Sequence, residues 1–318
     1  MNRSSLPLIS IVLCTYNGER HLKYQLDSLV AQTYKNIEIV IVDDCSDDNT
    51  RSILSDYLSR YAHINLFFNL ENLGFNKNFE KAITLAKGEF ISICDQDDIW
   101  DLDKIEELMA NIGDKGMIFS NSRLIDEDGL SMNRLLLAAP NFNLLDYKSI
   151  LINNFVAGHT ILAKTIFLEK TLPFPDYGYY DWWIGFLAIY HQEIVFLDKC
   201  LTSYRIHSNS VIQKEVSSPD SVAITLAQYK TSRYHQEIFY DFLKKNNNES
   251  FMRPLVLLYS KKTNIIERKY ILMFLIYHYN TLFPLHKRRR ITSTTRFKIV
   301  DRYLKDVLEC KLQVLGFI

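Results

Sequence analysis

The sequence lacks the features of secreted, disulfide-bonded and membrane-spanning proteins. Its five cysteines are scattered and form no CxxC pair, which favours a reducing compartment. Residues 1–7 do not combine a basic start with a following apolar stretch, so no secretory signal is expected. The longest apolar run near the C-terminus, residues 270–283, contains His278 and Asn280 and is shorter than the ~20 residues of a membrane span. We therefore expect a cytoplasmic protein.

An excess of charge of one sign is also missing. The 37 Lys and Arg residues balance 37 Asp and Glu residues, so there is no global attraction to nucleic acid, which is not expected as a partner. The chain has 318 residues, of which 47% are hydrophobic and 23% charged, enough for one large core domain and an appended unit. No internal repeat is present.

What the sequence does contain is an alternation of strand and helix patterns. Nearly continuous β-branched runs at 8–14 and 37–42 are typical of strands covered on both faces, and leucines recur at helical spacing across 18–32 between them. The alternation predicts an α/β fold with a doubly wound, mostly parallel, Rossmann-like sheet. The further elements predicted are helices at 49–61 and 76–87, strands at 64–69, 90–94 and 117–120, a short helix ending at 110, a turn at 126–129, and apolar runs at 194–197 and 201–206.

The last third of the chain has a different pattern. Residues 223–244 and 296–315 have helical patterns punctuated by charge, and Ser217, Ser218 and Pro219 interrupt the periodicity before them. We predict a main domain at 1–215 and a C-terminal helical region at 216–318, joined near 213–220.

Polar residues follow each of the first four predicted strands. They occupy 15–19, 43–46, 69–78 and 95–98. In an open parallel sheet ligands bind outside the carboxyl ends of the strands, so these segments are expected to converge on one binding edge.

The run Asp95-Gln96-Asp97-Asp98 is the clearest candidate for a site. Several carboxylates on one tight turn repel one another unless a cation neutralises them, which points to a hard divalent metal, Mg²⁺ or Mn²⁺. Alternatively, Asp98 or Asp101 caps the helix that follows. Since capping needs only one side chain, we favour the metal or ligand interpretation for Asp95 and Asp97.

Three motifs in order resemble glycosyltransferase family 2, which has the GT-A fold. They are SIVLCTYN at 10–17, IVIVDDCS at 39–46 and the aspartate cluster in the position of the family's DxD motif, and the resemblance covers roughly residues 8–211. The segments DQDDIW at 95–100, YDWW at 180–183 and YRIH at 204–207 are similar to those of bacterial rhamnosyltransferase-like members of the family, which build surface polysaccharides.

The resemblance implies a nucleotide pocket. Asp44 would accept a hydrogen bond from the imide N–H of a pyrimidine, so uridine or thymidine is expected. Alternatively, Asp44 caps the next helix or belongs to the acidic pair of a receiver domain. Gly74 would let the backbone approach the donor closely, or would only form a turn. The other residues implied to bind the nucleotide are Thr15, Tyr16, Glu19, Asn72, Asn78 and Asp95, the last at the ribose.

The resemblance also implies a metal that bridges the donor diphosphate. Asp97 would bind it and His207 would complete its coordination, whereas a lone histidine is more often structural. The metal would neutralise the charge that builds on the leaving nucleoside diphosphate.

For the reaction, the resemblance implies that Asp181 is the general base of an inverting transfer. Many family members have Glu-Asp here, whereas Tyr180 precedes this aspartate, and Asp181 could instead cap a helix at 182–190. Trp182 suits stacking on a sugar, and Trp183 suits core packing. The residues implied to contact sugar or acceptor are Asp98, Trp100, Gly158, His159 and Trp182.

The function expected from the resemblance is transfer of a hexose, such as rhamnose, from a dTDP- or UDP-sugar. The acceptor would be a hydroxyl of a glycan or lipid-linked molecule in surface polysaccharide synthesis. One alternative is a nucleotidyltransferase, although its Gly-rich basic loop is missing from 15–20, where only one glycine occurs. Another is an inactive sugar-binding module, which the presence of both Asp97 and Asp181 disfavours.

A basic run follows the aromatic segment 270–283. The sequence HKRRR at 286–290, next to apolar residues, suits a helix at an anionic membrane surface, so peripheral contact with the inner face of the cell membrane is one interpretation. A solvated charge run beside a core helix is the other.

Overall fold

The computed structural model describes residues 6–137, 142, 146–207, 226–260, 264–284 and 292–314. The chain forms two compact units. The first, here called the sheet unit, comprises Met1–Ala138, Phe155–Asp176 and Tyr180–Ile206. The second, the helical unit, comprises Ala139–Asn154, Tyr177–Tyr179 and His207–Ile318. The predicted join at 213–220 lies outside the described residues.

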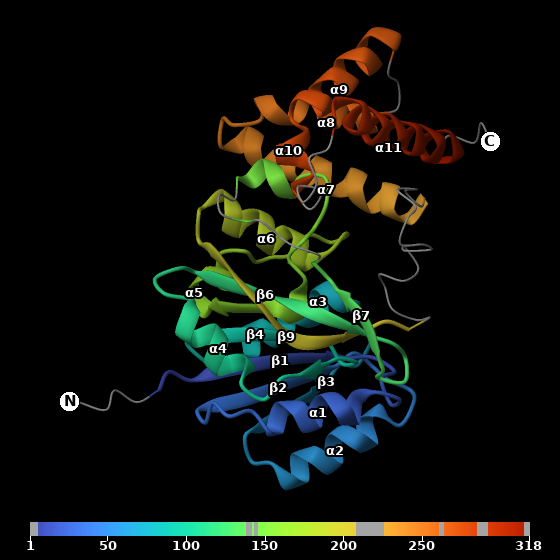
Figure 1. Ribbon diagram of the computed structural model, residues 1–318. Helices are drawn as coiled ribbons and strands as arrows, with labels where there is room; N and C mark the ends of the chain where they lie inside the picture. Colours follow the sequence, from blue (N-terminus) through green and yellow to red (C-terminus); the bar gives the residue numbers. More distant parts are fainter. Residues whose placement is uncertain are drawn as a thin grey trace. The chain divides into compact units, whose positions relative to one another are not determined.

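The sheet unit begins with the predicted parallel strands (Figure 1). They lie in the order β3-β2-β1-β4, so their carboxyl ends share one edge. Nearly every side chain of β1, β2 and β4 is buried, as their continuous apolar sequences require. The strands are β1 (Ile9–Thr15), β2 (Ile37–Asp43), β3 (Ile64–Phe68) and β4 (Phe90–Cys94).

Three helices cover this part of the sheet. They are α1 (Leu22–Val30), α2 (Thr50–Arg60) and α3 (Phe75–Leu85). Leu22, Leu26 and Leu29 of α1 pack with the inward residues of β1 and β2 in one core cluster, and α3 packs on β1 and β2 from the other face (Figure 1). Helix α1 begins at Leu22 rather than at the predicted Gly18, because the N–H groups of His21 and Leu22 both bond to the Gly18 carbonyl in a preceding turn.

The rest of the nine-stranded sheet is mixed. From β4 it continues through β8, β6, β9 and β5, and β7 pairs with β6. β9 pairs with β6 in parallel, whereas β8 is antiparallel to both β4 and β6. The strands are β5 (Ile99–Trp100), β6 (Met117–Ile125), β7 (Ser131–Leu135), β8 (Ile161–Lys164) and β9 (Ile194–Arg205).

Two features of this region correct the sequence prediction. The runs at 194–197 and 201–206 form one strand, β9, whose register with β6 shifts around Asn121. In addition, β5, β7 and β8 were not predicted. The helices of this region are α4 (Lys104–Asn111), the 3₁₀ turn η2 (Gly158–Thr160), α5 (Thr165–Glu169) and α6 (Tyr180–Tyr190).

The helical unit contains the predicted C-terminal helices. α7 packs on α8 and α11, and α9 packs on α8 and α11. Its elements are η1 (Tyr147–Ile150), α7 (Leu226–Lys245), η3 (Ser250–Met252), α8 (Arg253–Tyr259), α9 (Ile265–Tyr277), α10 (Tyr279–Leu282) and α11 (Ser293–Val314). Within the described ranges, no helix has both the length and the apolar character needed to span a membrane.

Candidate active site

Side-chain hydrogen bonds join the loops that follow β1, β2 and β4. The Thr15 hydroxyl donates to Asp43 Oδ1 at 3.0 Å. The Tyr16 N–H donates to Gln96 Oε1 at 2.9 Å, and Gln96 Nε2 donates back to the Tyr16 carbonyl at 3.0 Å. The Glu19 carboxylate accepts from the backbone N–H of Asn49 at 2.9 Å. The structure therefore brings three of the predicted polar segments together.

Asp44 lies buried at the centre of a second network. Its carboxylate accepts hydrogen bonds from Asn69 Nδ2 at 2.7 Å, from the Leu73 N–H at 2.8 Å and from the Gly74 N–H at 2.9 Å. Gly74 has φ +78°, a conformation that glycine adopts without strain. The Asp44 carboxylate therefore shapes the loop after β3, and its predicted contact with a pyrimidine would add to these bonds.

The two predicted asparagines belong to the same network. Asn72 Nδ2 donates to the Asp44 carbonyl at 3.2 Å. Asn78 is buried, and its Nδ2 donates to the Val42 carbonyl at 2.9 Å. Both amides hold the backbone of β2 and its loop, and their predicted contacts with a nucleotide stay predictions.

The acidic turn, residues 95–98, joins β4 to β5, and hydrogen bonds from Arg205 connect it to the end of β9. Asp98 is fully buried, and its Oδ1 accepts from the Arg205 N–H at 3.1 Å. The Arg205 guanidinium donates to the Asp97 carbonyl at 2.8 Å. Burial is the largest cause that raises the pKa of Asp98, followed by the negative charges of Asp97 and Asp95. The turn thus concentrates negative charge where water cannot solvate it fully.

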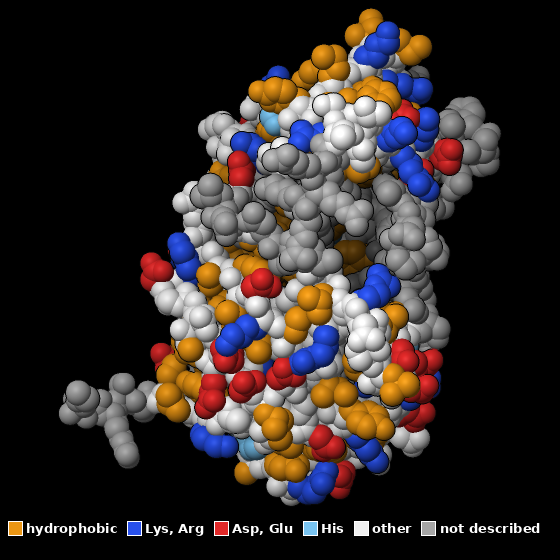
Figure 2. All heavy atoms as spheres, in the orientation of Figure 1, with side chains coloured by type: hydrophobic (Ala, Val, Ile, Leu, Met, Phe, Trp, Pro, Cys, Tyr) orange, Lys and Arg blue, Asp and Glu red, His pale blue; other side chains and the backbone are white. Residues whose placement is uncertain are grey.

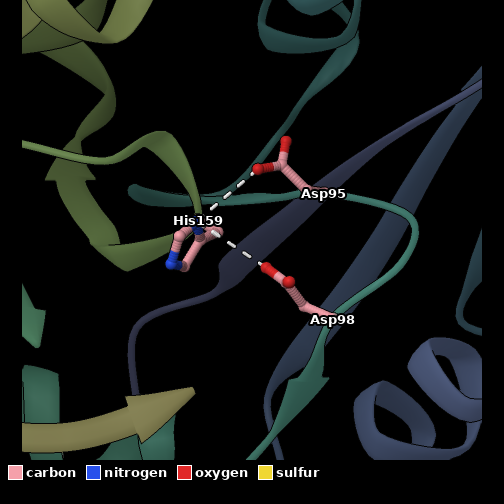
Figure 3. Close-up of side chains that lie close together, drawn as sticks. All are labelled: Asp95, Asp98 and His159. Carbon is pink, nitrogen blue, oxygen red and sulfur yellow. Dashed lines mark ion pairs between the residues drawn. The ribbon is translucent and has the colours of Figure 1, made fainter. Parts of the chain in front are cut away.

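His159, on η2, faces this turn (Figure 3). Its Nδ1 lies 3.6 Å from Asp95 Oδ2 and 3.7 Å from Asp98 Oδ2. Its Nε2 lies 2.8 Å from the Ser122 hydroxyl oxygen, and its ring stacks on Tyr204 with centroids 4.6 Å apart. Burial lowers the pKa of His159, which favours the neutral imidazole that can bind a metal.

Asp95, Asp98 and His159 fit a divalent cation. Their candidate ligand atoms all lie within 4.8 Å of one another. Asp98 Oδ2 is buried and accepts no hydrogen bond from the described residues, so a cation would stabilise it. Carboxylate oxygens suit Mg²⁺, and the imidazole nitrogen is a common ligand of transition metals.

The predicted metal ligands Asp97 and His207 have different positions. Asp97 lies in the acidic turn and is half-buried. His207 lies two residues beyond the end of β9 and is the first residue of the last segment of the helical unit. Both assignments stay predictions, and His159, expected at the sugar, is the histidine that the structure places beside Asp95 and Asp98.

Lys104 is a buried cation that the sequence analysis did not find. It opens α4, donates to the His159 carbonyl at 2.6 Å and to the Thr202 hydroxyl at 2.9 Å, and lies 3.4 Å from the Trp100 ring centroid. Burial lowers its pKa to about 7, although nearby acidic groups oppose this. The sequence offered one signal for this residue: Lys104 follows shortly after the cluster of aspartates at 95–98, whose negative charge needs compensation.

Asp181 lies in the first turn of α6 and is half-buried. Its Oδ2 accepts from the Gly158 N–H at 3.0 Å, which links it to the turn that carries His159. A Cβ at position 158 would collide with the Tyr180 hydroxyl, so a larger residue there would displace Tyr180 or the turn.

Tyr204, whose ring stacks on His159, is a buried phenol near several carboxylates. Burial is the main cause that raises the pKa of Tyr204, and the carboxylates of Asp98, Asp95, Asp97 and Asp181 raise it further. Burial and negative charge therefore both oppose ionisation of this phenol.

The two adjacent tryptophans differ in burial. Trp182, expected at the sugar, is buried, whereas Trp183, expected in the core, is half-buried and donates from Nε1 to the Thr171 carbonyl at 2.9 Å. Trp100 and Asp98 are buried too. Asp98, Trp100 and Trp182 were predicted to contact the sugar or the acceptor, and their burial does not support this prediction.

The sequence is similar to those of proteins that are named as glycosyltransferases. The chain is 27% identical to a putative teichuronic acid biosynthesis glycosyltransferase, TuaG, of Bacillus subtilis, over 64% of this chain and 81% of that protein. It is 26% identical to an uncharacterized glycosyltransferase of Rickettsia typhi, over 80% of each protein.

Two solved structures share the fold. Residues 1–349 of Staphylococcus aureus TarS, in complex with UDP-GlcNAc, match with a TM-score of 0.59 and 19% identity, over 97% of this chain and 92% of that one. The mannosyltransferase PcManGT of Pyrobaculum calidifontis, in complex with GDP-Man and Mn²⁺, matches with a TM-score of 0.56 and 15% identity, over 96% of this chain and 88% of that one. Both likenesses are to glycosyltransferases with the GT-A fold.

The family itself follows from the sequence match. The model of glycosyl transferase family 2 matches residues 10–171, about half of the chain, and this range contains most of β1, the Asp44 loop, the acidic turn and His159. The chain therefore belongs to glycosyl transferase family 2 and is a glycosyltransferase.

Proposed function

We propose that this enzyme transfers a hexose, such as rhamnose, from a dTDP- or UDP-sugar to an acceptor hydroxyl, with inversion at the anomeric carbon. The acceptor would be a glycan or lipid-linked molecule of surface polysaccharide synthesis, and the name of the Bacillus relative supports this class. The observation that carries the proposal is the hydrogen bond from the Gly158 N–H to the Asp181 carboxylate, because the next residue, His159, lies 3.6 Å from Asp95 and 3.7 Å from Asp98.

The nucleotide would lie over the carboxyl ends of β1 and β2. Asp44 is a carboxylate held by three hydrogen-bond donors, and an ionised carboxylate can accept the imide N–H of uracil or thymine as a further bond. Thr15, Tyr16 and Glu19 border the same loops. Neighbours with the same fold that contain UDP-GlcNAc or GDP-Man support a nucleotide-sugar as the donor.

A divalent cation, Mg²⁺ or Mn²⁺, would bind at the acidic turn. Asp95, Asp98 and His159 would hold it, with Asp97 and His207 as the ligands implied by the family's motifs. When bound, such an ion neutralises the charge that develops on the leaving diphosphate. Arg205 contributes by fixing the backbone of the turn against β9.

Asp181 would act as the general base. The Gly158 N–H holds one carboxylate oxygen and so orients the group. The acceptor oxygen attacks the anomeric carbon and gives its proton to Asp181, while the bond from that carbon to the diphosphate breaks and the nucleoside diphosphate leaves with the electron pair. The new bond forms on the opposite face from the leaving group, which inverts the configuration.

A panel of donors tests the proposal. The protein is incubated with dTDP-rhamnose, UDP-galactose, UDP-glucose and UDP-N-acetylglucosamine, with and without Mn²⁺ or Mg²⁺, and release of nucleoside diphosphate is measured. We expect metal-dependent release from at least one donor. Pyrophosphate release from a nucleoside triphosphate and a sugar phosphate would instead identify a nucleotidyltransferase.

The assignment of Asp181 has its own test. Asp181→Asn keeps the shape of the side chain and its bond to Gly158 but cannot take a proton. We expect donor affinity to stay within about twofold and transfer to fall at least about a hundredfold, the usual contribution of a general base. Wild-type transfer by this variant would refute the assignment.

A further inference from the structure

Helix α9 of the helical unit is apolar on two sides. Ile271 and Leu275 are buried and face the unit's core. Ile266, Met273 and Tyr277 lie on the outward side and are 77%, 71% and 84% exposed. Tyr270, also exposed, completes a row at positions i, i+4, i+7 and i+11, which is one face of a helix. We call Ile266, Tyr270, Met273 and Tyr277 the outer face of α9.

An outward face of this kind needs a partner. The solvent side of a surface helix is normally polar, and a contiguous exposed apolar patch marks an interaction site. Figure 2 shows hydrophobic side chains gathered at the top of the view, where Figure 1 places α9, with basic side chains among them.

The surroundings of the outer face are strongly basic. Arg268 and Lys269 of α9 are exposed, as is Lys298 of α11, the helix that packs on α9. In the sequence, positions 261–298 hold ten Lys and Arg residues and a single acidic residue, Glu267, although the whole chain is balanced. Apolar residues flanked by such positive charge match a surface with anionic groups above an apolar layer.

The same charge disfavours a second copy of this chain as the partner. A two-fold dimer through this face would place each basic segment against its own copy, and like charges facing each other oppose association. The α9 helix has 13 residues, fewer than the ~20 that cross a bilayer, so it would lie along the surface.

We propose that the outer face of α9 docks on an anionic lipid membrane. The helix lies parallel to the bilayer, its four apolar side chains enter the headgroup region, and the flanking lysines and arginines pair with lipid phosphates. This proposal does not rest on the donor, metal or base assigned above.

Vesicle flotation of the full chain tests the proposal. The vesicles contain either phosphatidylcholine alone or equal parts of phosphatidylcholine and phosphatidylglycerol. We expect the wild-type protein to float with the anionic vesicles at low salt, and far less with the neutral ones. The triple variant Ile266→Ser, Met273→Ser, Tyr277→Ser should bind at least about tenfold more weakly, because it removes apolar area that would be buried in lipid.

A matched control removes exposed apolar side chains elsewhere. Leu58, Leu130 and Ile166 are 42%, 67% and 64% exposed and lie in the sheet unit, so replacing all three by serine should leave vesicle binding unchanged. A charge variant, Arg268→Ser with Lys269→Ser, should weaken binding to anionic vesicles roughly fivefold per charge removed. Circular dichroism checks that every variant is folded.

Four results would overturn the proposal. The wild-type protein could fail to float with anionic vesicles, or it could float equally well with neutral ones. The control could lose binding as much as the α9 variant. Finally, sedimentation velocity without lipid could show an oligomer that the α9 variant abolishes, which would make this face an interface between copies of the chain.

Discussion

At the scale of single residues, Gly158 links the base to the acidic turn. Its N–H binds Asp181, and its missing side chain leaves room for the Tyr180 hydroxyl. His159, the next residue, faces Asp95 and Asp98. A shift of this backbone therefore displaces the candidate base and the candidate metal ligand together.

Gly158→Ala should consequently impair transfer more than folding. The added Cβ forces either Tyr180 or the turn to move, at a cost of about 1–3 kcal/mol in the free energy of unfolding. We expect turnover to fall at least about tenfold, since small displacements of catalytic groups are costly. Tyr180→Phe in the same chain removes the colliding oxygen and should restore part of the activity. Wild-type turnover by Gly158→Ala alone would show that the geometry of this turn is unimportant.

The residues of the site were only partly predictable from the sequence. The residues Asp44, Asp95 and Asp98 follow buried strands, so their place at the carboxyl edge could be inferred from local pattern alone. Lys104 and Ser122 could not be assigned in this way, because they reach the segment around His159 through tertiary packing. The burial of Trp182 and the partial exposure of Trp183 could not be predicted either, since the direction in which α6 packs decides which ring is covered.

At the scale of elements, prediction succeeded where the apolar pattern is continuous. Strands β1, β2 and β4 are buried on both faces and stand out from the sequence. β9 was read as two runs because Asp198 and Lys199 are exposed and interrupt its apolar pattern. β5 has two residues and β7 is exposed throughout, so neither carries the pattern of a buried strand.

Helix α7 supplies a prediction about acid stability. His235 is fully buried, its Nε2 accepts the Tyr179 N–H at 2.9 Å, and burial lowers its pKa to about 3. Between about pH 3 and about pH 6.5 the unfolded chain therefore binds a proton that the folded chain excludes. The free energy of unfolding should fall as the pH drops through this window, by up to about 1.4 kcal/mol per pH unit.

Replacing this histidine isolates its contribution. In His235→Gln the amide oxygen can still accept the Tyr179 N–H, but no side chain titrates. Urea unfolding from about pH 7 to about pH 5 should show a shallower loss of stability in the variant than in the wild-type protein. The exposed His191 provides the control, since His191→Gln should follow the wild-type curve. Identical curves for all three proteins would contradict the role given to His235.

At the scale of the whole molecule, the balanced total charge conceals local differences. The acidic turn of the sheet unit concentrates carboxylates beside a buried lysine, while positions 261–298 concentrate basic residues. Composition alone excluded a global attraction to anions, but only the position of charges in the chain and their exposure show where a cation or an anionic surface would bind.

Calorimetry with UDP and dTDP tests the central claim most directly. The account predicts that at least one of the two binds when Mn²⁺ or Mg²⁺ is present, and that Asp95→Asn and Asp97→Asn each weaken this binding at least about tenfold. Asp114→Asn, at an exposed aspartate away from the turn, should bind as the wild-type protein does. If neither nucleotide binds in the presence of either metal, or if binding is the same without metal, the claim that the acidic turn holds a nucleotide diphosphate through a cation is wrong.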